Sequence, residues 1–365
     1  LERPSSVSIS RNTHRGRTLY RFSFVILIQR TLGFLRLLAR KPASWRLGIR
    51  RSGDKVRIGP VPLRLRFTRR VIHRYNRRMF IVCDWGSSRL RAWLVDETGK
   101  VSGRYKSEHG VKAMAGSDRA FRDELGAVIS GFGVGQEVPV RISGMAGAKG
   151  GWVETEYVST PAGSDGFSGN SVAVSGFPDV RVYGGLMHTR RDGSVDVMRG
   201  EEIQVFGLLA KNPEASLICL PGTHSKWVRV EDGKITGFKT YMTGDLFHSL
   251  CENSIFRSQI NGTEFHREGF LHGCRLAAEG KGLNDLFTLR TEYVFSKIPA
   301  GGFHSCLSGF LIANEIRAEA VSGTPFLCGS EALAGIYGLA LAEAGVKSVV
   351  TDSEAATIRG HMEMI

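Results

Sequence analysis

Residues 83–104 read CDWGSSRLRAWLVDETGKVSGR, and residues 219–238 repeat the pattern as CLPGTHSKWVRVEDGKITGF. In each stretch a Cys ends an apolar run, a Gly and a hydroxyl residue follow, and a Trp stands inside a strand-like segment. Each stretch closes on Gly-Lys, a β-branched residue, a hydroxyl residue and Gly. The repeat predicts two β-hairpins of one kind, and hence two related domains that face one another.

The segments around the two hairpins alternate between strand and helix patterns. Apolar residues at helical spacing predict helices, and short apolar runs bounded by glycine or proline predict buried strands. The helices fall in residues 117–132, 198–213, 305–321 and 330–345, and the strands in 79–86, 138–147, 180–186, 324–329 and, as the last element, 346–350. This alternation predicts an α/β protein with layered sheets and helices, and its ligand site is expected in the cleft between the two domains.

The charge of the chain is divided unevenly along its length. The formal net charge is +14, but 21 of the 49 Lys and Arg residues lie in residues 1–78, against only Glu2 and Asp54. Residues 79–365 hold the other 28 basic and 33 acidic residues, a net charge of −5. The sequence therefore divides into a basic extension and a mildly acidic body.

The basic extension, residues 1–78, allows several interpretations. Its longest apolar stretch, FVILI, is far shorter than the roughly 20 residues that span a bilayer. Its Arg-rich, acid-poor composition is compatible with a transit peptide, and also with phosphate contacts to nucleic acid. Because Met79 stands directly before the first regular strand, we favour a disordered extension or translated sequence upstream of the true start.

The body, residues 79–365, has the length of two ordinary domains. Its six Cys residues are scattered without a C-x-x-C pair, so neither a zinc site nor a disulfide framework is predicted. A reducing cytoplasm fits this usage, and no apolar run suggests a membrane span. The sequence leaves the oligomeric state open.

The loops of the two hairpins have the composition of phosphate-binding turns. In Gly86-Ser87 and Gly222-Thr223, a tight turn can point backbone N–H groups and one hydroxyl into a common space. Asp84, beside the first Gly, could hold Mg²⁺ through its waters. Either loop alone would be an ordinary hairpin turn, but together with Asp84 they predict a grip on a polyphosphate.

Phosphoryl transfer to an alcohol also needs a carboxylate that accepts the hydroxyl proton. Glu201 and Glu202 lie just upstream of the second loop, where they could equally stabilise the start of a helix. Arg199 beside them could neutralise substrate or phosphate charge. His224 and Lys226 stand where phosphate is expected, the Lys as a point charge.

At this point the body resembles the 2-dehydro-3-deoxygalactonokinase family, sugar-acid kinases of the actin-like ATPase superfamily. The matching stretches, in order through residues 79–345, are DWGSSRLRAW, SGMAGAKGGWVETEYVSTPAG, DVMRGEEIQVFG, LPGTHSKWVRVEDGKITGFKTYMTGDLF and LSGFLIANEI. MRGEE together with PGTHSKWV is specific to the family, whereas DWGSS occurs throughout the superfamily. The resemblance implies two ribonuclease H-like, actin-type ATPase domains, residues 79–198 and 199–365, with an interdomain cleft.

The resemblance also implies an activity and a set of site residues. The enzyme would move the γ-phosphate of ATP, with Mg²⁺, to the 6-hydroxyl of 2-dehydro-3-deoxy-D-galactonate in galactonate breakdown. Glu201 would be the base, with Glu202 second and Arg199 beside them. The nucleotide would contact Asp84, Gly86, Ser87, Ser88, Gly222, Thr223, His224, Lys226 and, at the adenosine, Gly329. The sugar acid would lie under the loop that carries Gly144, Met145, Lys149, Trp152 and Tyr157.

Three alternatives stay open at this stage. A kinase for another sugar or sugar acid is the nearest, because Ala148 and Lys149 depart from the expected family pattern. A non-catalytic, actin-like nucleotide-binding regulator is disfavoured by the presence of Glu201 and Glu202. A nucleic-acid-associated protein would rest on residues 1–78 alone, since the acidic body predicts no nucleic-acid binding.

Overall fold

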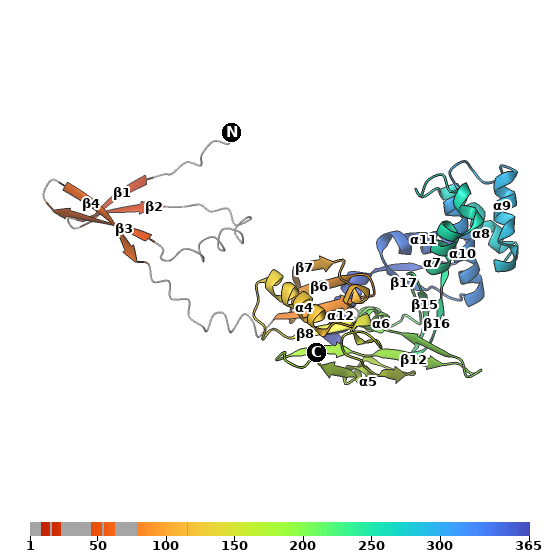
Figure 1. Cartoon of the computed structure of the whole chain (residues 1–365), viewed down its shortest axis with the longest axis horizontal. Coiled ribbons are helices and arrows are strands. Elements are labelled where there is room, and N and C mark those ends of the chain that lie inside the picture. Colours follow the sequence, from red (N-terminus) through yellow and green to blue (C-terminus); the bar gives the residue numbers. More distant parts are fainter. Residues whose placement is uncertain (1–8, 15–16, 23–44, 53–54, 63–78, 115) are drawn as a thin grey trace. The chain divides into compact units, whose positions relative to one another are not determined.

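The computed structural model describes residues 9–14, 17–22, 45–52, 55–62, 79–114 and 116–365. It divides into two compact units, residues 1–71 and 72–365. In the first unit β1 (Ile9–His14) pairs with β2 (Arg17–Phe22), and β3 (Trp45–Ser52) pairs with β4 (Lys55–Pro62), both antiparallel (Figure 1). The interpretation of residues 1–78 as a disordered extension or a start-site artefact falls largely on residues outside the described ranges, and it stays a prediction.

The second unit contains two sheets with the same central strand order. The first sheet runs β10-β11-β8-β5-β6-β7 and the second runs β16-β15-β14-β17-β18. Their bounds are β5 Met79–Trp85, β6 Leu90–Asp96, β7 Val101–Ser107, β8 Val140–Gly144, β10 Ser171–Ala173, β11 Val180–Tyr183, β14 Leu217–Leu220, β15 Ser225–Glu231, β16 Lys234–Tyr241, β17 Phe326–Gly329 and β18 Val349–Asp352. In each sheet an antiparallel three-strand meander is followed by two parallel strands, so the halves of this unit are topological duplicates.

The repeated sequence forms the same hairpin in each sheet. β5–β6–β7 is one meander and β14–β15–β16 is the other, and each shifts its register shortly after the repeated Trp. Both closing turns contain a glycine in the left-handed region, Gly99 with φ 81° and Gly233 with φ 72°. A Cβ is disfavoured at such φ, which explains why both copies keep glycine there.

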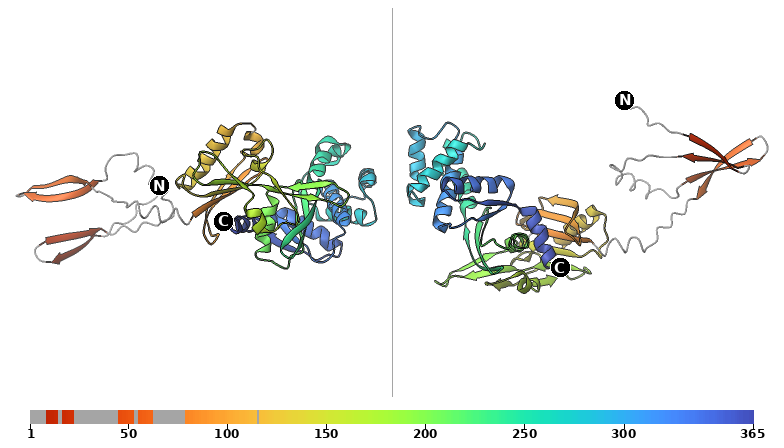
Figure 2. Two further views of the ribbon diagram at one scale, coloured as in Figure 1. Left: turned by 90° about the horizontal axis from the view of Figure 1, so that it is seen from below. Right: turned by 180° about the vertical axis from the view of Figure 1, so that it is seen from behind.

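The helices cover the faces of these sheets. Their bounds are α3 Val111–Met114, α4 Asp118–Phe132, α5 Ser164–Ser168, α6 Glu201–Leu209, α7 Thr243–Asn253, α8 Arg267–Ala278, α9 Phe287–Val294, α10 Phe303–Glu319, α11 Glu331–Glu343 and α12 Ser353–Glu363. Helices α7 to α10 gather at one end of the unit, as the further views show (Figure 2). A third sheet lies beside the second one, and its strand order is β13 (Val195–Met198), β12 (Gly185–Thr189) and β9 (Tyr157–Ser159). An isolated antiparallel bridge joins Ala162, which follows β9, to Ile235 of β16.

Helices α6 and α12 cross at two glycines and so join the halves of the unit. A Cβ on Gly207 would lie 1.9 Å from the carbonyl oxygen of Ala356, and one on Gly360 would lie 1.8 Å from that of Ile203. Neither position has room for a side chain, because the two backbones are in direct contact. Helix α12 continues to the first sheet, where Ile358 packs in a cluster with Val82 of β5.

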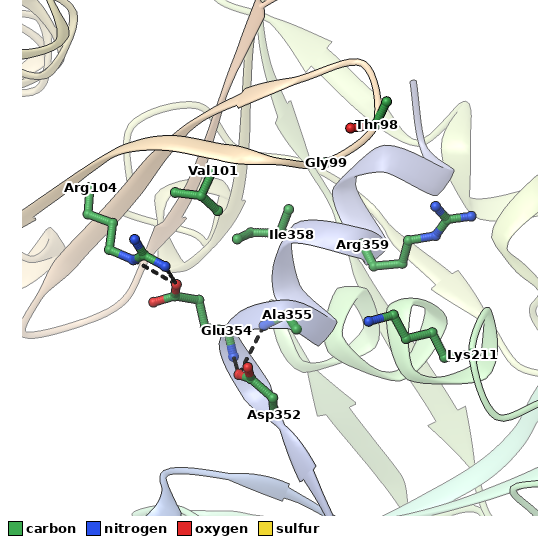
Figure 3. Close-up of a pocket in the computed structure, with 10 residues that line it drawn as sticks. All are labelled: Thr98, Gly99, Val101, Arg104, Lys211, Asp352, Glu354, Ala355, Ile358 and Arg359. Carbon is green, nitrogen blue, oxygen red and sulfur yellow. Dashed lines mark hydrogen bonds and ion pairs between the residues drawn. The ribbon is translucent and has the colours of Figure 1, made fainter.

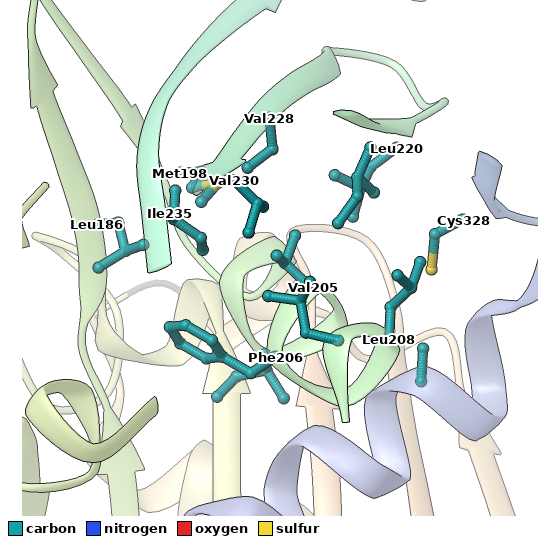
Figure 4. Close-up of a cluster of buried hydrophobic side chains, with 14 of the residues drawn as sticks. Leu186, Met198, Val205, Phe206, Leu208, Leu220, Val228, Val230, Ile235 and Cys328 are labelled. Atoms are coloured by element: carbon teal, nitrogen blue, oxygen red, sulfur yellow. The ribbon is translucent and has the colours of Figure 1, made fainter. Parts of the chain in front are cut away.

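The largest part of the second half's core surrounds α6. Val205, Phe206 and Leu208 of α6 pack against inward-facing residues of the second sheet, including Leu220 and Val228 (Figure 4). Side chains of β12 and β13 complete this cluster. Since α6 begins at Glu201, this packing fixes the position of the carboxylates at its first turn.

The predicted α/β class and the two related sheets are confirmed, with several local differences. The expected strand 180–186 is two strands, because the chain passes at Gly184 from the first sheet into the three-stranded sheet. Helix α12 was not predicted, because the strand 346–350 was expected to be the last element. Its N-cap signal was present in the sequence, for Asp352 accepts hydrogen bonds from the backbone N–H groups of Glu354 and Ala355.

The cysteines and the helix lengths agree with the composition. All six Cys residues are free thiols in this structure, and all but Cys251 are buried. Within the described residues, no helix has both the length and the apolar character needed to cross a membrane.

Candidate active site

The first loop, residues 86–89, connects β5 to β6. It is closed by a hydrogen bond of 2.9 Å from the Gly86 N–H to the Arg89 carbonyl. The backbone N–H of Lys112 donates to the Ser87 carbonyl at 2.9 Å, and a Cβ on Gly110 would lie only 2.3 Å from the Ser88 carbonyl carbon. The segment just before and in α3 therefore supports the loop, with Gly86 and Ser87 partly buried and Ser88 exposed.

The second loop, residues 221–224, connects β14 to β15 and is supported in the same way. The backbone N–H of Asp245 donates to the Thr223 carbonyl at 3.0 Å, and a Cβ on Gly244 would lie 2.6 Å from the Gly222 carbonyl oxygen. The start of α7 thus holds this loop as the start of α3 holds the first. Thr223 and His224 are exposed, so their side chains are available to a ligand.

Asp84 lies at the end of β5, directly before the first loop. Its carboxylate forms a short ion pair with Arg91, the residue opposite it on β6. Burial raises the pKa of Asp84, the Arg91 guanidinium opposes that rise, and the negative charge of Glu201 adds to it. The sequence analysis missed Arg91, although antiparallel pairing across the predicted hairpin would have placed it there.

Two glycines bring Glu201 to Asp84. Gly144 ends β8 with φ 92°, and a Cβ on it would lie 3.3 Å from Oδ1 of Asp84. Gly200 precedes α6 with φ 104°, and a Cβ on it would lie 3.1 Å from the Cα of Gly144. The backbones of the two halves therefore meet at these glycines, which places the first turn of α6 beside the end of β5.

Glu201 is the partly exposed carboxylate of this group. Its side chain is 30 % exposed, and its Oε2 accepts a hydrogen bond of 2.9 Å from the Arg199 backbone N–H. Its Oε1 lies 3.4 Å from Nζ of Lys226, whose side chain is 6 % exposed. Lys226 comes from β15, so Glu201 stands between a residue of the first hairpin and a residue of the second.

Glu202 occupies a different environment from its neighbour. It is fully buried, and both of its carboxyl oxygens lie within 2.8 Å of the Gly200 backbone nitrogen. Burial, and then the charge of Glu201, raises the pKa of Glu202 to about 8. At neutral pH this carboxyl is therefore mostly protonated, and it supports the turn before α6 from inside.

Arg199 is a buried link to the predicted sugar-acid loop. Its guanidinium donates hydrogen bonds to Oγ1 and to the carbonyl of Thr155, and lies 4.2 Å from the ring centroid of Tyr157. Its Nε has no hydrogen-bond partner. The residue is 8 % exposed, so within this structure its charge acts on the loop more than on solvent.

The remaining residues of the predicted sugar-acid loop divide into exposed and packed ones. Met145, Lys149 and Tyr157 are exposed. Trp152 stacks on Phe121 with ring centroids 5.5 Å apart, and its Nε1 donates to Asp118 at 2.8 Å. Trp152 therefore anchors the loop to α4.

Gly329 ends β17 next to the second loop. A Cβ there would lie 3.2 Å from Cδ of Pro221, so the predicted adenosine contact and the second loop share one edge of the sheet.

In the second loop, Nε2 of His224 lies 3.7 Å from the carboxylate of Asp245. Over the ranges that the structure describes, no hydrogen bond or ion pair joins the first loop to the second.

A cavity of about 250 Å³ lies apart from this group, at the start of α12 (Figure 3). Its lining includes Arg104, Lys211 and Arg359, but Arg104 pairs with Glu354 and Arg359 pairs with Glu363. The cavity contains none of the predicted site residues.

In the described part of the chain, no cluster of three or more His, Cys, Asp or Glu side chains could hold a metal ion by itself.

The chain is similar to known proteins over most of its length. The family model of 2-keto-3-deoxy-galactonokinase matches residues 84–364. A protein of Rhizobium meliloti named "Probable 2-dehydro-3-deoxygalactonokinase" is 33% identical over 293 residues, 77% of this chain and 94% of its own length. The 2-dehydro-3-deoxygalactonokinase of Escherichia coli K12 is 32% identical over 245 residues, 66% of this chain and 80% of its own.

One solved structure is similar in both sequence and fold. It comes from Sinorhizobium meliloti, is described as a 2-dehydro-3-deoxygalactonokinase protein, and has 33% sequence identity and a TM-score of 0.71. The match covers 77% of this chain and 96% of that protein.

Proposed function

The chain belongs to the 2-keto-3-deoxy-galactonokinase family, and we propose that it transfers the γ-phosphate of ATP to the 6-hydroxyl of 2-dehydro-3-deoxy-D-galactonate. Its two duplicated α/β halves are consistent with the actin-like ATPase architecture that the resemblance implies for such a kinase. The observation that supports the transfer most directly is the placement of Glu201 between Asp84 and Lys226.

Glu201 is the better candidate for the base that accepts the hydroxyl proton. A base must be deprotonated and must reach the substrate, and Glu201 is partly exposed at the junction of the two halves. Glu202 is fully buried and its pKa is raised to about 8, so it is mostly protonated when the reaction runs at pH 7. The structural features of the two residues therefore support Glu201 as base and Glu202 as its support.

The proposed reaction is an in-line displacement in which positioning supplies most of the catalysis. Glu201 takes the proton as the substrate hydroxyl oxygen attacks the γ-phosphorus. The bond from phosphorus to the bridging oxygen breaks, and ADP leaves with that electron pair. The backbone N–H groups of the first and second loops, with Thr223 and His224, stabilise the negative charge on the phosphates.

The chemistry of the site fits Mg²⁺ at Asp84. Burial and, to a smaller extent, the like charge of Glu201 raise the pKa of Asp84 against the opposing effect of the Arg91 guanidinium, and a cation would add to that compensation. Few protein ligands are needed, because Mg²⁺ keeps several waters and binds substrate phosphates. The bound ion would supply neutralisation of phosphate charge, with Asp84 as the protein carboxylate that holds it.

The sugar-acid loop offers cations and an aromatic side chain to an anionic substrate. Lys149 is exposed, and Tyr157 presents its ring over the Arg199 guanidinium. We propose that Lys149 contacts the substrate carboxylate, and that Gly144, Met145, Trp152 and Tyr157 shape the sugar-acid site. Domain closure then excludes water from the transferred phosphate.

The substrate is tested by measuring ADP release from Mg²⁺-ATP by the full chain over a panel of sugars and sugar acids. The proposal predicts turnover with 2-dehydro-3-deoxygalactonate well above that with the gluconate-derived epimer. Preference for another sugar acid would contradict the proposed substrate and keep the transfer. Nucleotide binding with no turnover on any compound of the panel would favour a regulatory protein.

Two further predictions are untested: a cytoplasmic location and the absence of nucleic-acid binding by residues 79–365.

A further inference from the structure

Glu315 of α10 is a buried carboxyl surrounded by hydrogen-bond donors. The residue is 3 % exposed. Its Oε1 accepts from Oγ of Ser225 and from Nε1 of Trp227, both at 2.8 Å, and its Oε2 accepts from the hydroxyl of Tyr337 at 3.0 Å. The Thr243 side chain also lies close enough to this carboxyl to favour its ionised form. A buried carboxyl with this many donors is tightly fixed, since the loss of any donor would leave it under-solvated.

Two of these residues flank the second loop. Ser225 is the first residue of β15 and directly follows the loop. Thr243 is the first residue of α7, and the next two residues, Gly244 and Asp245, contact the Gly222 and Thr223 carbonyls. Glu315 therefore holds both the exit of the loop and the helix start that supports it.

The other two donors connect the same carboxyl to the body of the domain. Trp227 lies two residues beyond Ser225 and is fully buried in the cluster formed with α8, α10 and α11. Tyr337 belongs to α11, the helix that follows Gly329. The second loop is thus tied through one side chain to the packed core of its domain.

From this arrangement we propose that Glu315 is a positioning residue for the second loop, and that it sets the loop's backbone for the phosphates of the nucleotide. This role rests on the proposed kinase function. Ser225 donates its hydroxyl inward to Glu315, so Gly222, Thr223 and His224 are left to face the ligand. Without the carboxyl, both supports of the loop lose their common anchor.

The first hairpin provides a comparison within the chain. Trp93, the counterpart of Trp227, also lies close to a helical carboxyl, that of Glu354 in α12. Glu354 pairs in addition with Arg104 of β7, so it braces the strands of that hairpin at a distance from its loop. In both halves the repeated Trp therefore lies near a helical carboxyl. Of the two carboxyls, Glu315 also accepts a hydrogen bond from the residue that directly follows a loop, Ser225.

Glu319 offers a matched control on the same helix. It lies four residues after Glu315, is 6 % exposed, and also accepts from the second hairpin. Its partners are Arg229 and the hydroxyl of Tyr241, which belong to β15 and β16 rather than to the loop. Both residues are buried carboxyls of α10, and they differ in whether they hold the second loop.

The test compares nucleotide binding by the full chain carrying Glu315→Gln or Glu319→Gln. Calorimetry measures the affinities for the β,γ-imido analogue of ATP, with Mg²⁺, and for adenosine. For Glu315→Gln we expect the affinity for the ATP analogue to fall about tenfold, while adenosine binding stays unchanged. Glu319→Gln should keep both affinities, and KM for the sugar acid should be unchanged in both variants.

Three results would overturn the inference. The first is an unchanged affinity of Glu315→Gln for the ATP analogue, and the second is an equal loss for the analogue and adenosine. The third is the same loss in Glu319→Gln. If Glu315→Gln does not fold, Ser225→Ala removes only the donor at the loop exit, and it must lower the ratio of analogue to adenosine affinity. An unaltered chain that binds neither ligand refutes the kinase proposal itself, and with it this role.

Discussion

The ammonium group of Lys226 lies 3.4 Å from Oε1 of Glu201. Lys226 belongs to the second hairpin, and its Nζ also donates to the His224 carbonyl at 3.1 Å. The residue expected to be a point charge for phosphate is therefore nearly buried and faces the proposed base. The positive charge of Lys226 compensates the negative charge of Glu201 beside Asp84, where the two sheet-containing halves meet.

Replacing Lys226 with Met should lower turnover. The variant keeps the aliphatic stem and removes the charge, so the carboxylate of Glu201 loses its cationic partner, whereas Asp84 keeps its ion pair with Arg91. We expect kcat to fall about tenfold or more, because charges at such a site act in a low dielectric. Steady-state kinetics measure the effect, and Lys100→Met, an exposed lysine at the first hairpin turn, is the control. Equal activity of both variants would remove Lys226 from the site.

Replacing Glu202 with Gln should leave turnover at pH 7 within about threefold of the original, since Gln resembles a protonated carboxyl and the pKa of Glu202 is raised to about 8. Burial favours the neutral form, so the amide loses little at neutral pH. The measurement is kcat between pH 6 and 9. A loss as large as that of the corresponding change at Glu201 would show that Glu202 takes the proton.

Replacing Gly110 with Ala should weaken ATP binding through the first loop. The added Cβ would lie 2.3 Å from the Ser88 carbonyl carbon and 2.4 Å from the Arg89 nitrogen, both backbone atoms. The loop must move, and we expect KM for ATP to rise about tenfold while KM for the sugar acid stays the same. Gly126→Ala in α4, where a Cβ meets nothing within 4 Å, is the control. Unchanged kinetics in Gly110→Ala would mean that the first loop does not contact the nucleotide.

Acid should destabilise the fold through His361 of α12. Its ring is fully buried, with Nε2 3.1 Å from Oγ of Ser143, and burial lowers its pKa to about 3 from an ordinary 6.5. The unfolded chain takes up this proton near pH 6.5 and the folded chain only near pH 3, so stability falls as the pH decreases through that window. Between pH 7 and 5 the loss from this group is about 2 kcal/mol.

Urea unfolding at pH 7 and pH 5 measures this effect, with His361→Gln as the comparison. The variant begins less stable, because it changes the contact with Ser143, but its stability should fall less between the two pH values. The same pH dependence in both proteins would show that other groups cause the acid loss.

The sequence predicted the parts of the fold that depend on local signals. The hairpin repeat indicated two related halves, and it placed Gly99 and Gly233 in the closing turns, where the structure gives both a positive φ. The Gly-hydroxyl loops were found in the same way, because short turns carry characteristic residues. Glu201 could be named only by the resemblance of its motif and by its proximity in sequence to the second loop.

The rest of the site depends on contacts between distant residues. Gly144 and Gly200 meet only after both sheets form, and nothing local indicates that their backbones touch. The different environments of Glu201 and Glu202 follow from the direction that each takes from the first turn of α6. Trp152 was named from the resemblance alone, and its stacking on Phe121 comes from the packing of the loop on α4, which no local signal indicates.

Turnover of Glu201→Gln decides whether Glu201 is the base of the phosphoryl transfer. Turnover with Mg²⁺-ATP and 2-dehydro-3-deoxygalactonate is measured beside the affinity for the β,γ-imido analogue. We predict that turnover falls by about a hundredfold or more, the size expected for a lost general base, while the analogue binds as before. Turnover close to that of the unaltered chain would contradict this assignment.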